Sequence, residues 1–221
     1  MGHKIHPIGF RLGPLFTWDS RWFANNQQYK HFVIEDTVIR RDPFKKLRVA
    51  GLTKIEIERS INKIAIILHV VRPGMVIGRG GQGMEDIKKY IQTLLLKMRK
   101  DRPVKNQSPV KLDIRVEQVK EPYLNAYFVA SQIAEQLAKR LPHKRVVSYA
   151  IEKVMNSGAK GVKVMLSGRI GGAEISRRET FKLGSIPLST IREVIDYEHI
   201  PSLTKSGYVG VKVWICKREV I

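Results

Sequence analysis

Residues 76–83 read Val-Ile-Gly-Arg-Gly-Gly-Gln-Gly and stand directly before a strongly amphipathic helical pattern. Glycines let the main chain approach a sugar–phosphate backbone without a Cβ in the way. The N-terminus of the following helix adds oriented N–H donors and partial positive charge. Together with the cation of Arg79, this segment predicts a loop that binds the phosphates of a nucleic acid.

The elements around this loop make up a small α/β module. Residues 54–59 and 64–70 alternate between apolar and polar side chains, which predicts an antiparallel hairpin with a turn at 60–62. From Met84 on, apolar residues follow one helical face, which we expect to pack on the hairpin. The other expected parts are a helix or two half-helices at 30–50, with Asp42-Pro43 as N-cap and first-turn proline, a helical turn at 75–77, a polar connection at 101–108 and a strand at 110–116.

The second half of the chain has a different pattern. Glu121-Pro122 marks a junction, and apolar residues at helical spacing then predict helices around 127–137 and 146–155. Strand patterns follow at 162–167, 175–183 and 209–216, with a glycine turn at 168–172. These elements predict two helices that cover a mainly antiparallel sheet.

Three regions are expected along the chain. Residues 1–29 combine glycine, proline and scattered aromatic residues without a sustained period, which indicates an arm that orders on something larger. The α/β module occupies residues 30–120 and the second α+β domain residues 121–221. The overall fold class is therefore α/β, or α+β.

The charge points to a polyanionic partner. Forty Lys and Arg residues stand against twenty Asp and Glu residues, a formal net charge of +20. An ordinary small domain carries a net charge of about 2 to 8 in magnitude, so this excess favours binding to nucleic acid. No segment approaches the ~18 apolar residues of a membrane span, and no signal peptide is apparent before residue 30. We expect a cytoplasmic protein with no membrane partner.

Enzymatic and metal chemistry lack support in the sequence. Cys216 is the only cysteine and lies in an apolar strand pattern, and the six histidines show no metal-binding spacing. Glu56 with Glu58, and Asp196 with Glu198, are the only side-by-side carboxylates we considered, and such pairs are more often solvated than catalytic. We therefore expect no catalytic residues, no metal and no cofactor.

The glycine loop has two alternative interpretations, a dinucleotide-binding loop and a purely structural corner. Residues 78–83 also satisfy the G-x-G-x-x-G pattern of dinucleotide-binding folds, but in those folds the glycines follow directly on a strand. Here a Pro-Gly break and a helical turn intervene after Val71, and the acidic residue at the right distance, Asp101, precedes the next strand. A corner between two helices would explain the glycines, but it gives Arg79 no role.

Between two helices, Gly78-Arg79-Gly80-Gly81 resembles the G-x-x-G loop of a KH domain, which clamps about four single-stranded nucleotides. The order of elements is similar to that of the prokaryotic, type II arrangement. One variable position is cationic and the other is glycine, which suits backbone binding better than base selection.

The resemblance extends over almost the whole chain, which is similar to the family of the third protein of the bacterial small ribosomal subunit. The segments that carry it are Met1–Pro7, Gly9–Gly13, Trp22–Ala24, the glycine loop, Gly158–Gly161, Ser167–Ile175, Pro187-Leu188, Ile195–Tyr197 and Gly210–Ile215. The resemblance implies a KH domain followed by a second α/β domain, located in the head of the small subunit beside ribosomal proteins ten and fourteen.

The resemblance also implies a surface that lines the channel through which messenger RNA enters and helps to unwind it. Its basic residues correspond here to Lys139, Arg140, Lys144 and Arg145. Ser148 and Tyr149 stand where the family often has further cations, so unwinding is expected to be weaker.

For ribosomal RNA we expect phosphate contacts, which are salt-dependent and carry little sequence information. The candidates flank the glycine turn of the second sheet or lie in the arm: Lys4, Arg11, Arg169, Arg177, Arg178 and Lys182. A free-standing KH regulator is the alternative, although it would hardly need the arm and the second domain.

Overall fold

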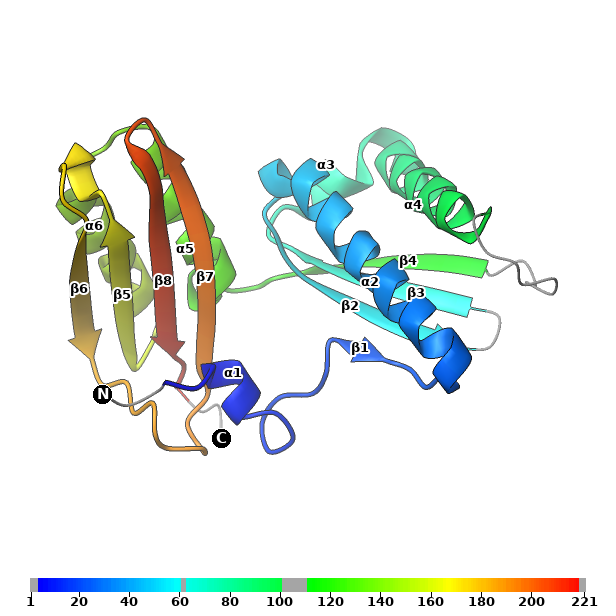
Figure 1. Cartoon of the computed structure of the whole chain (residues 1–221), viewed down its shortest axis with the longest axis horizontal. Coiled ribbons are helices and arrows are strands. Elements are labelled where there is room, and N and C mark those ends of the chain that lie inside the picture. Colours follow the sequence, from blue (N-terminus) through cyan, green and yellow to red (C-terminus); the bar gives the residue numbers. More distant parts are fainter. Residues whose placement is uncertain (1–3, 61–62, 101–110, 219–221) are drawn as a thin grey trace. The chain divides into compact units, whose positions relative to one another are not determined.

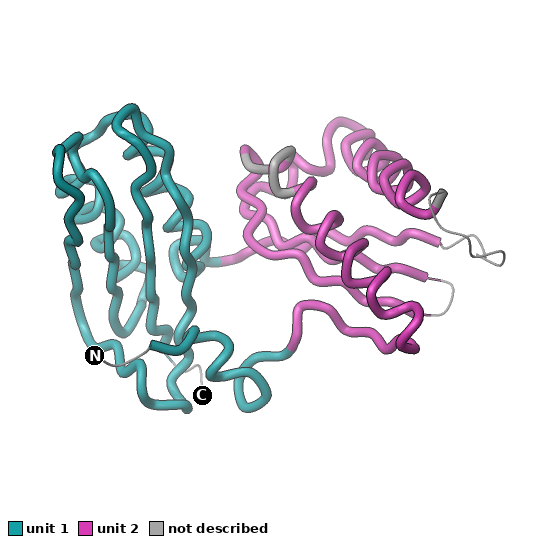
Figure 2. Tube along the Cα trace, in the orientation of Figure 1, with its two compact units in different colours: residues 1–17, 121–221 teal, residues 18–120 magenta. Residues whose placement is uncertain are grey.

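The computed structural model describes residues 4–60, 63–100 and 111–218 and divides the chain into two compact units (Figures 1 and 2). Unit 1 comprises Met1–Thr17 with Glu121–Ile221, and unit 2 comprises Trp18–Lys120. Residues 1–29, expected as one arm, are thus divided between the units. Within the described ranges, no helix has the length and apolar character needed to cross a membrane.

Unit 2 is built on a four-stranded sheet in the order β1-β2-β3-β4. Its strands are β1 (Ser20–Arg21), β2 (Leu52–Ser60), β3 (Lys63–Val70) and β4 (Lys111–Gln118). The antiparallel β2–β3 hairpin and the later strand β4 confirm the expected elements, and β4 runs parallel to β3. The centre of the expected turn at 60–62 and the whole expected connection at 101–108 lie outside the described residues.

The helices of unit 2 are α2 (Asn26–Lys46), α3 (Pro73–Ile77) and α4 (Gln82–Lys100), with short 3-10 turns at Arg48–Ala50 and Arg79–Gly81. Ile39 of α2 and Ile91 of α4 share one core with the buried isoleucines of the hairpin, so α4 packs as expected. The N-cap expected at Asp42-Pro43 is wrong, because α2 continues through Pro43. Pro43 has no N–H to donate to the Ile39 carbonyl, so α2 lacks one bond at this point. The helix ends within one turn of the proline, where the Leu47 N–H donates to the Pro43 carbonyl at 2.8 Å.

A buried ion network ties α2 to β2 and α4. The Glu35 carboxylate is fully buried, and Arg59 Nη1 and Arg99 Nε lie 2.7 and 3.1 Å from its oxygens. Arg59 also pairs with Asp36, which accepts a hydrogen bond from Trp22 Nε1 at 2.7 Å. Burial opposes ionisation of Glu35, but the hydrogen bonds from Arg99 and Arg59 outweigh it, so the pKa of Glu35 is lowered. The network also holds the segment after β1 against α2.

Removing Arg59 should destabilise unit 2, because Glu35 and Asp36 would keep their charges in a buried site with fewer partners. We expect Arg59→Ala to lower the free energy of unfolding by about 3 to 5 kcal/mol. Arg21→Ala is the control, because Arg21 pairs with Glu56 and Glu58 on an exposed face and such pairs contribute about 1 kcal/mol or less. Urea-dependent hydrogen exchange of peptides from α2 and β2 measures both, and equal losses would contradict a structural role for the buried network.

Unit 1 is a four-stranded antiparallel sheet in the order β6-β5-β8-β7. The strands are β5 (Gly161–Gly168), β6 (Arg177–Gly184), β7 (Ile195–Thr204) and β8 (Gly207–Cys216). Helices α5 (Ala126–Ala138) and α6 (His143–Asn156) cover one face, as Figure 1 shows, which confirms the expected layers. The short helix α1 (Pro7–Phe10) lies against β7, and 3-10 turns occur at Pro122–Leu124 and Ile170–Gly172.

Strand β7 was not expected from the sequence. Its segment carries several polar residues, and Pro201 cannot donate to a ladder. Because β7 is an edge strand that pairs only with β8 among the described strands, it tolerates this proline. Cys216 in β8 is fully buried as expected, and burial raises the pKa of its thiol to about 11.

Candidate nucleic-acid interface

The glycine loop is a sharp corner between α3 and α4. The backbone of Gly78, Gly80 and Gly81 lies in the left-handed region, with φ angles of 71°, 61° and 82°. Residues with a Cβ rarely adopt these angles, so the conformation requires glycine. The corner places Arg79 at an exposed position immediately before the first turn of α4.

The glycines of this corner have two different roles. A Cβ on Gly83 would lie 2.5 Å from the Val76 carbonyl oxygen, and one on Gly78 would lie 3.0 Å from the Gly83 nitrogen. These two glycines let α3 and α4 approach each other, as a purely structural corner would require. A Cβ on Gly80 or Gly81 would meet nothing within 4 Å, so the outer side of the loop is open for a ligand.

The surroundings of the loop differ from a dinucleotide site. The whole of α3 separates β3 from the glycines, whereas the dinucleotide fold needs a direct strand-to-loop junction. Asp101, the acidic residue considered for the ribose, lies outside the described residues.

Two apolar side chains beside the loop were not singled out from the sequence as binding residues. Met75 and Ile77 of α3 are 53% and 41% exposed, while Val76 between them is buried in the core. The sequence does contain a signal for this exposure: three consecutive apolar residues lie on a helix that is too short to bury all of them. An exposed apolar surface next to a cationic loop can contact bases while the loop contacts their phosphates.

A second group of cations lies where α5 ends and α6 begins. Lys139 and Arg140 follow α5, and Lys144 and Arg145 lie in the first turn of α6; all four are exposed. Arg140 has a φ of 63°, which is uncommon for a residue with a side chain. The structure therefore brings the four residues expected to contact messenger RNA to one end of unit 1.

The glycine turn of the second sheet lies at the same end. A cavity of about 350 Å³ is lined by Arg140 and His143 together with Arg169, Gly171, Gly172 and Lys205. Arg169 is exposed and donates from Nε to the Ala173 carbonyl at 2.8 Å, which braces the turn. Arg140, a candidate for messenger RNA, and Arg169, a candidate for ribosomal RNA, thus line the same cavity.

The other residues expected to bind ribosomal RNA have different surroundings. Lys4, Arg178 and Lys182 are exposed. Arg177 is exposed too, but its Nε lies 2.8 Å from Glu179 Oε1, so a carboxylate already compensates much of its charge.

The structure contradicts the expectation for Arg11. This side chain is fully buried, and its guanidinium donates to the carbonyls of Glu193 at 2.7 Å, Thr190 at 2.8 Å and Leu188 at 3.1 Å. Its guanidinium nitrogens all donate to main-chain carbonyls in the interior, so this side chain cannot contact a phosphate. Arg11 instead fastens the N-terminal segment to the connection before β7.

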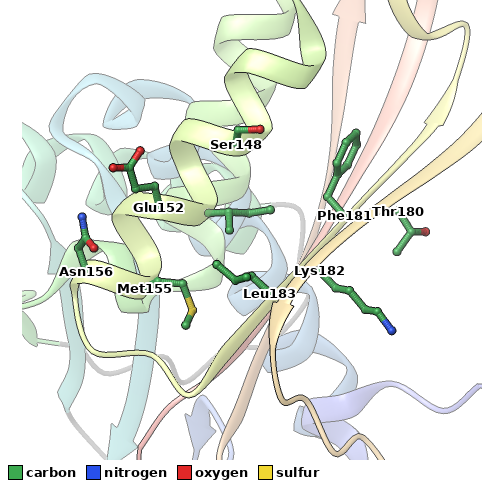
Figure 3. A pocket seen from close by; sticks show the side chains of 9 residues that line it. Ser148, Glu152, Met155, Asn156, Thr180, Phe181, Lys182 and Leu183 are labelled. Atoms are coloured by element: carbon green, nitrogen blue, oxygen red, sulfur yellow. The ribbon is translucent and has the colours of Figure 1, made fainter.

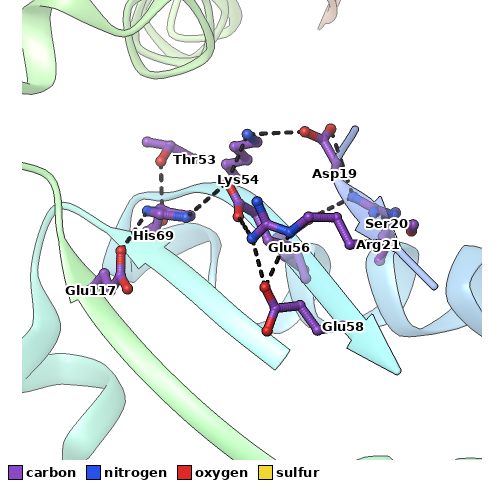
Figure 4. Close-up of polar contacts among 11 residues, drawn as sticks. Asp19, Ser20, Arg21, Thr53, Lys54, Glu56, Glu58, His69 and Glu117 are labelled. Atoms are coloured by element: carbon purple, nitrogen blue, oxygen red, sulfur yellow. Dashed lines mark hydrogen bonds and ion pairs between the residues drawn. The ribbon is translucent and has the colours of Figure 1, made fainter. Parts of the chain in front are cut away.

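Carboxylates considered for catalysis have structural partners. Glu56 and Glu58 both pair with Arg21, and Glu56 also pairs with Lys54 at 2.8 Å (Figure 4). Asp196 accepts a hydrogen bond from the first N–H of α5 at 3.1 Å. Within the described residues, no group of three or more His, Cys, Asp or Glu side chains could hold a metal ion.

A larger hollow lies between α6 and β6 and has a different character. It measures about 660 Å³, and Figure 3 shows side chains of α6 facing those of the edge strand. Ile151, Met155, Phe181 and Leu183 make it mainly apolar. This groove suits apolar side chains and not a phosphate.

Comparison with known proteins agrees with the geometry. A family model described as "KH domain" matches residues 38–124, and one described as "Ribosomal protein S3, C-terminal domain" matches residues 133–215. The match to the first confirms the KH arrangement expected from the loop and the element order.

Curated relatives match over the full length of the chain. The small ribosomal subunit protein uS3 of Caldicellulosiruptor bescii is 43% identical over 221 residues, covering 100% of this chain and 94% of that protein. Its counterparts in Clostridium novyi and Myxococcus xanthus are 43% and 42% identical, covering 100% of this chain and 95% and 94% of theirs. The chain therefore belongs to the uS3 family, whose members are structural, non-enzymatic proteins of the small ribosomal subunit.

Proposed function

We propose that this chain binds ribosomal RNA in the head of the small subunit and lines the channel through which messenger RNA enters, where it helps to unwind structured message. The observation that carries this proposal is the open, left-handed glycine corner with exposed Arg79 at the start of α4. The proposed function involves binding only and neither forms nor breaks a covalent bond. As a ribosomal component the chain works in the cytoplasm.

The loop binds single-stranded RNA through its backbone. Gly80 and Gly81 leave the main chain uncovered, so a sugar–phosphate backbone can approach the amides at the start of α4. Arg79 adds one charge-assisted contact to a phosphate. Because neither feature reads a base edge, the loop tolerates different sequences.

Reversing the charge at the loop tests this mechanism. The double variant Arg79→Asp, Gly80→Asp should weaken binding to a short unstructured RNA by tenfold or more and lower the slope of log K against log salt by about 1, the loss expected for one phosphate contact. Fluorescence anisotropy over a salt titration measures both quantities.

The matched control is Arg79→Asn, Gly80→Asn. Asn tolerates the left-handed backbone at position 80 about as well as Asp and removes the cation without adding negative charge. Its loss of affinity should be clearly smaller. Unchanged affinity in the Asp variant would remove the loop from the mechanism.

The cations of unit 1 act on messenger RNA by holding phosphates. Lys139, Arg140, Lys144 and Arg145 project from two successive segments, so they can attract a strand along a short path. Ser148 and Tyr149 lie four residues after Lys144 and Arg145, on the same side of α6. The cationic stripe is therefore interrupted after one helical turn, before Lys153, whose ammonium lies 5.4 Å from the centre of the Tyr149 ring. This interruption is why we propose weak unwinding.

Removing part of this stripe should slow translation of structured message. In ribosomes carrying Lys144→Ala, Arg145→Ala, we expect several-fold slower movement through a stable hairpin and a normal rate on unstructured message. Extending the stripe with Ser148→Arg, Tyr149→Lys should have the opposite effect. Single-molecule translation on paired templates measures the two rates.

Lys30→Ala, Lys97→Ala removes the same charge from exposed positions of unit 2 and serves as the control. If Lys144→Ala, Arg145→Ala prevents the chain from entering the subunit, the pair has a structural role and the proposed unwinding role is wrong.

Neighbouring proteins are part of the proposal. The family resemblance supports contacts with ribosomal proteins ten and fourteen of the small subunit. A free-standing KH regulator is the alternative. Sedimentation of a lysate in high magnesium separates the two: the proposed component travels with the small subunit, and a regulator stays near the top of the gradient.

A further inference from the structure

The face of the unit 1 sheet opposite α5 and α6 carries a set of cations from three strands. Val162, Val164 and Leu166 of β5 point into the core under the helices, so the residues between them point the other way. In that alternation Lys163 stands directly opposite Lys182 of β6, and Lys212 of β8 stands opposite Met165. Arg178 is opposite Ser167, one row further along.

Within the described strands of this sheet, these cations have no acidic neighbours on their own face. The three cross-strand rows that contain Lys163, Met165 and Ser167 hold no Asp or Glu at their paired positions in β6, β8 and β7. Glu179 of β6 is paired with Leu166 and belongs to the helix side. The acidic residues of β7, Asp196 and Glu198, alternate with Tyr197 and face the helix side, where Asp196 bonds to α5. Glu193 lies in the connection before β7, and its carboxylate pairs with Lys160.

The cations repel one another. Burial and the nearby charges of Lys4 and Lys182 lower the pKa of Lys163. Burial and the charge of Lys212 likewise lower the pKa of His199. A polyanion on this face would relieve that repulsion.

The outer face of the unit 2 sheet shows that such repulsion is not a general property of the chain. There Lys54 lies 2.8 Å and Arg21 lies 2.7 Å from Glu56 (Figure 4). Lys63 lies 2.8 Å from Asp113. The cations on the outer face of the unit 2 sheet are thus paired with carboxylates, whereas the named cations on the corresponding face of the unit 1 sheet are not, as far as the structure describes the chain.

In the three rows that hold the cations, the aromatic side chains are already occupied, while Tyr208 of β8, on the same face beyond the Ser167 row, is 68% exposed. Trp214 is only 7% exposed, and the Lys163 ammonium lies 5.1 Å from the centre of its ring. Tyr197 packs against His6 with ring centres 4.9 Å apart. A sheet usually holds single-stranded RNA by stacking two or three bases on exposed rings, and Tyr208 offers one such ring outside the rows of cations, so this face is better suited to a continuous phosphate backbone.

We propose that Lys163, Lys182, Lys212 and Arg178, with Lys4 at the edge, form a docking surface for the backbone of base-paired RNA. This inference rests on the proposed RNA-binding function and adds to it a second surface for a different class of RNA. The glycine loop of unit 2 takes single strands, and the open sheet of unit 1 takes a duplex without reading its sequence.

The test compares the purified chain with the triple variant Lys163→Gln, Lys182→Gln, Lys212→Gln on an RNA duplex of about 16 base pairs, the length that other duplex-binding domains span. We expect duplex affinity to fall tenfold or more and the slope of log K against log salt to fall by about 3, one per lost phosphate contact. Binding of an unstructured single strand should change no more than in the control.

The control is Lys30→Gln, Lys97→Gln, Lys120→Gln, which removes the same charge from exposed positions of unit 2. A second variant with Arg at positions 163, 182 and 212 keeps the charge and should keep duplex affinity within about twofold, because Arg also binds phosphate. Thermal melting by circular dichroism verifies that all three variants fold.

Each other outcome has a distinct meaning. Equal losses in the Gln variant and the control would show an effect of net charge alone and overturn the docking surface. Poly-glutamate binding that is as strong as duplex binding and is lost in the same variant would assign the face to an acidic protein and also overturn it. If the unaltered chain binds neither RNA, the proposed function itself fails; if it binds single strands through Arg79 while the Gln variant matches its control, only the docking surface fails.

Discussion

The organising constraint in this chain is that twenty carboxylates cannot neutralise forty cations, so folding decides which cations are paired and which remain free. The paired ones stabilise the fold: Arg59 and Arg99 meet Glu35 in the interior of unit 2, where an uncompensated charge would be costly. Exposed or half-buried cations that pair with no carboxylate of the described residues include Arg79 at the glycine corner, Lys144 and Arg145 at the start of α6, and Lys163, Lys182 and Lys212 on the sheet of unit 1. We propose that a polyanion compensates these three groups.

Backbone geometry gives this charge its selectivity. The left-handed glycines at 78, 80 and 81 and the close approach at Gly83 build a corner with an uncovered main chain, which favours a flexible single strand. The sheet of unit 1 instead presents charges on a regular surface where Trp214 and Tyr197, the rings in the same rows as the cations, are occupied. We propose that one chain thereby holds two forms of RNA, a role that fits its membership of a family of ribosomal structural proteins.

Much of this architecture could be predicted from the sequence because the patterns are local. Alternation at 54–59 and 64–70 predicted the hairpin, and the glycines at 78–83 predicted a G-x-x-G loop between two helices. Strand β7 escaped prediction because its pairing with β8 and its contact with α5 are tertiary, and Pro201 hid the pattern. Arg11 was misassigned because its carbonyl partners near residues 188–193 are distant in the chain. The same limit applies to the sheet face: pairing register, not sequence order, brings Lys163, Lys182 and Lys212 together.

The most direct test of the central claim is ultraviolet crosslinking of RNA to this chain within purified small subunits, with the linked peptides identified by mass spectrometry. The account predicts crosslinks in the peptide that contains Gly78–Gly81 and in those that carry the free cations of unit 1, and none at the buried Arg11. A chain that sediments with the subunit yet crosslinks to RNA at none of these cationic surfaces would contradict it.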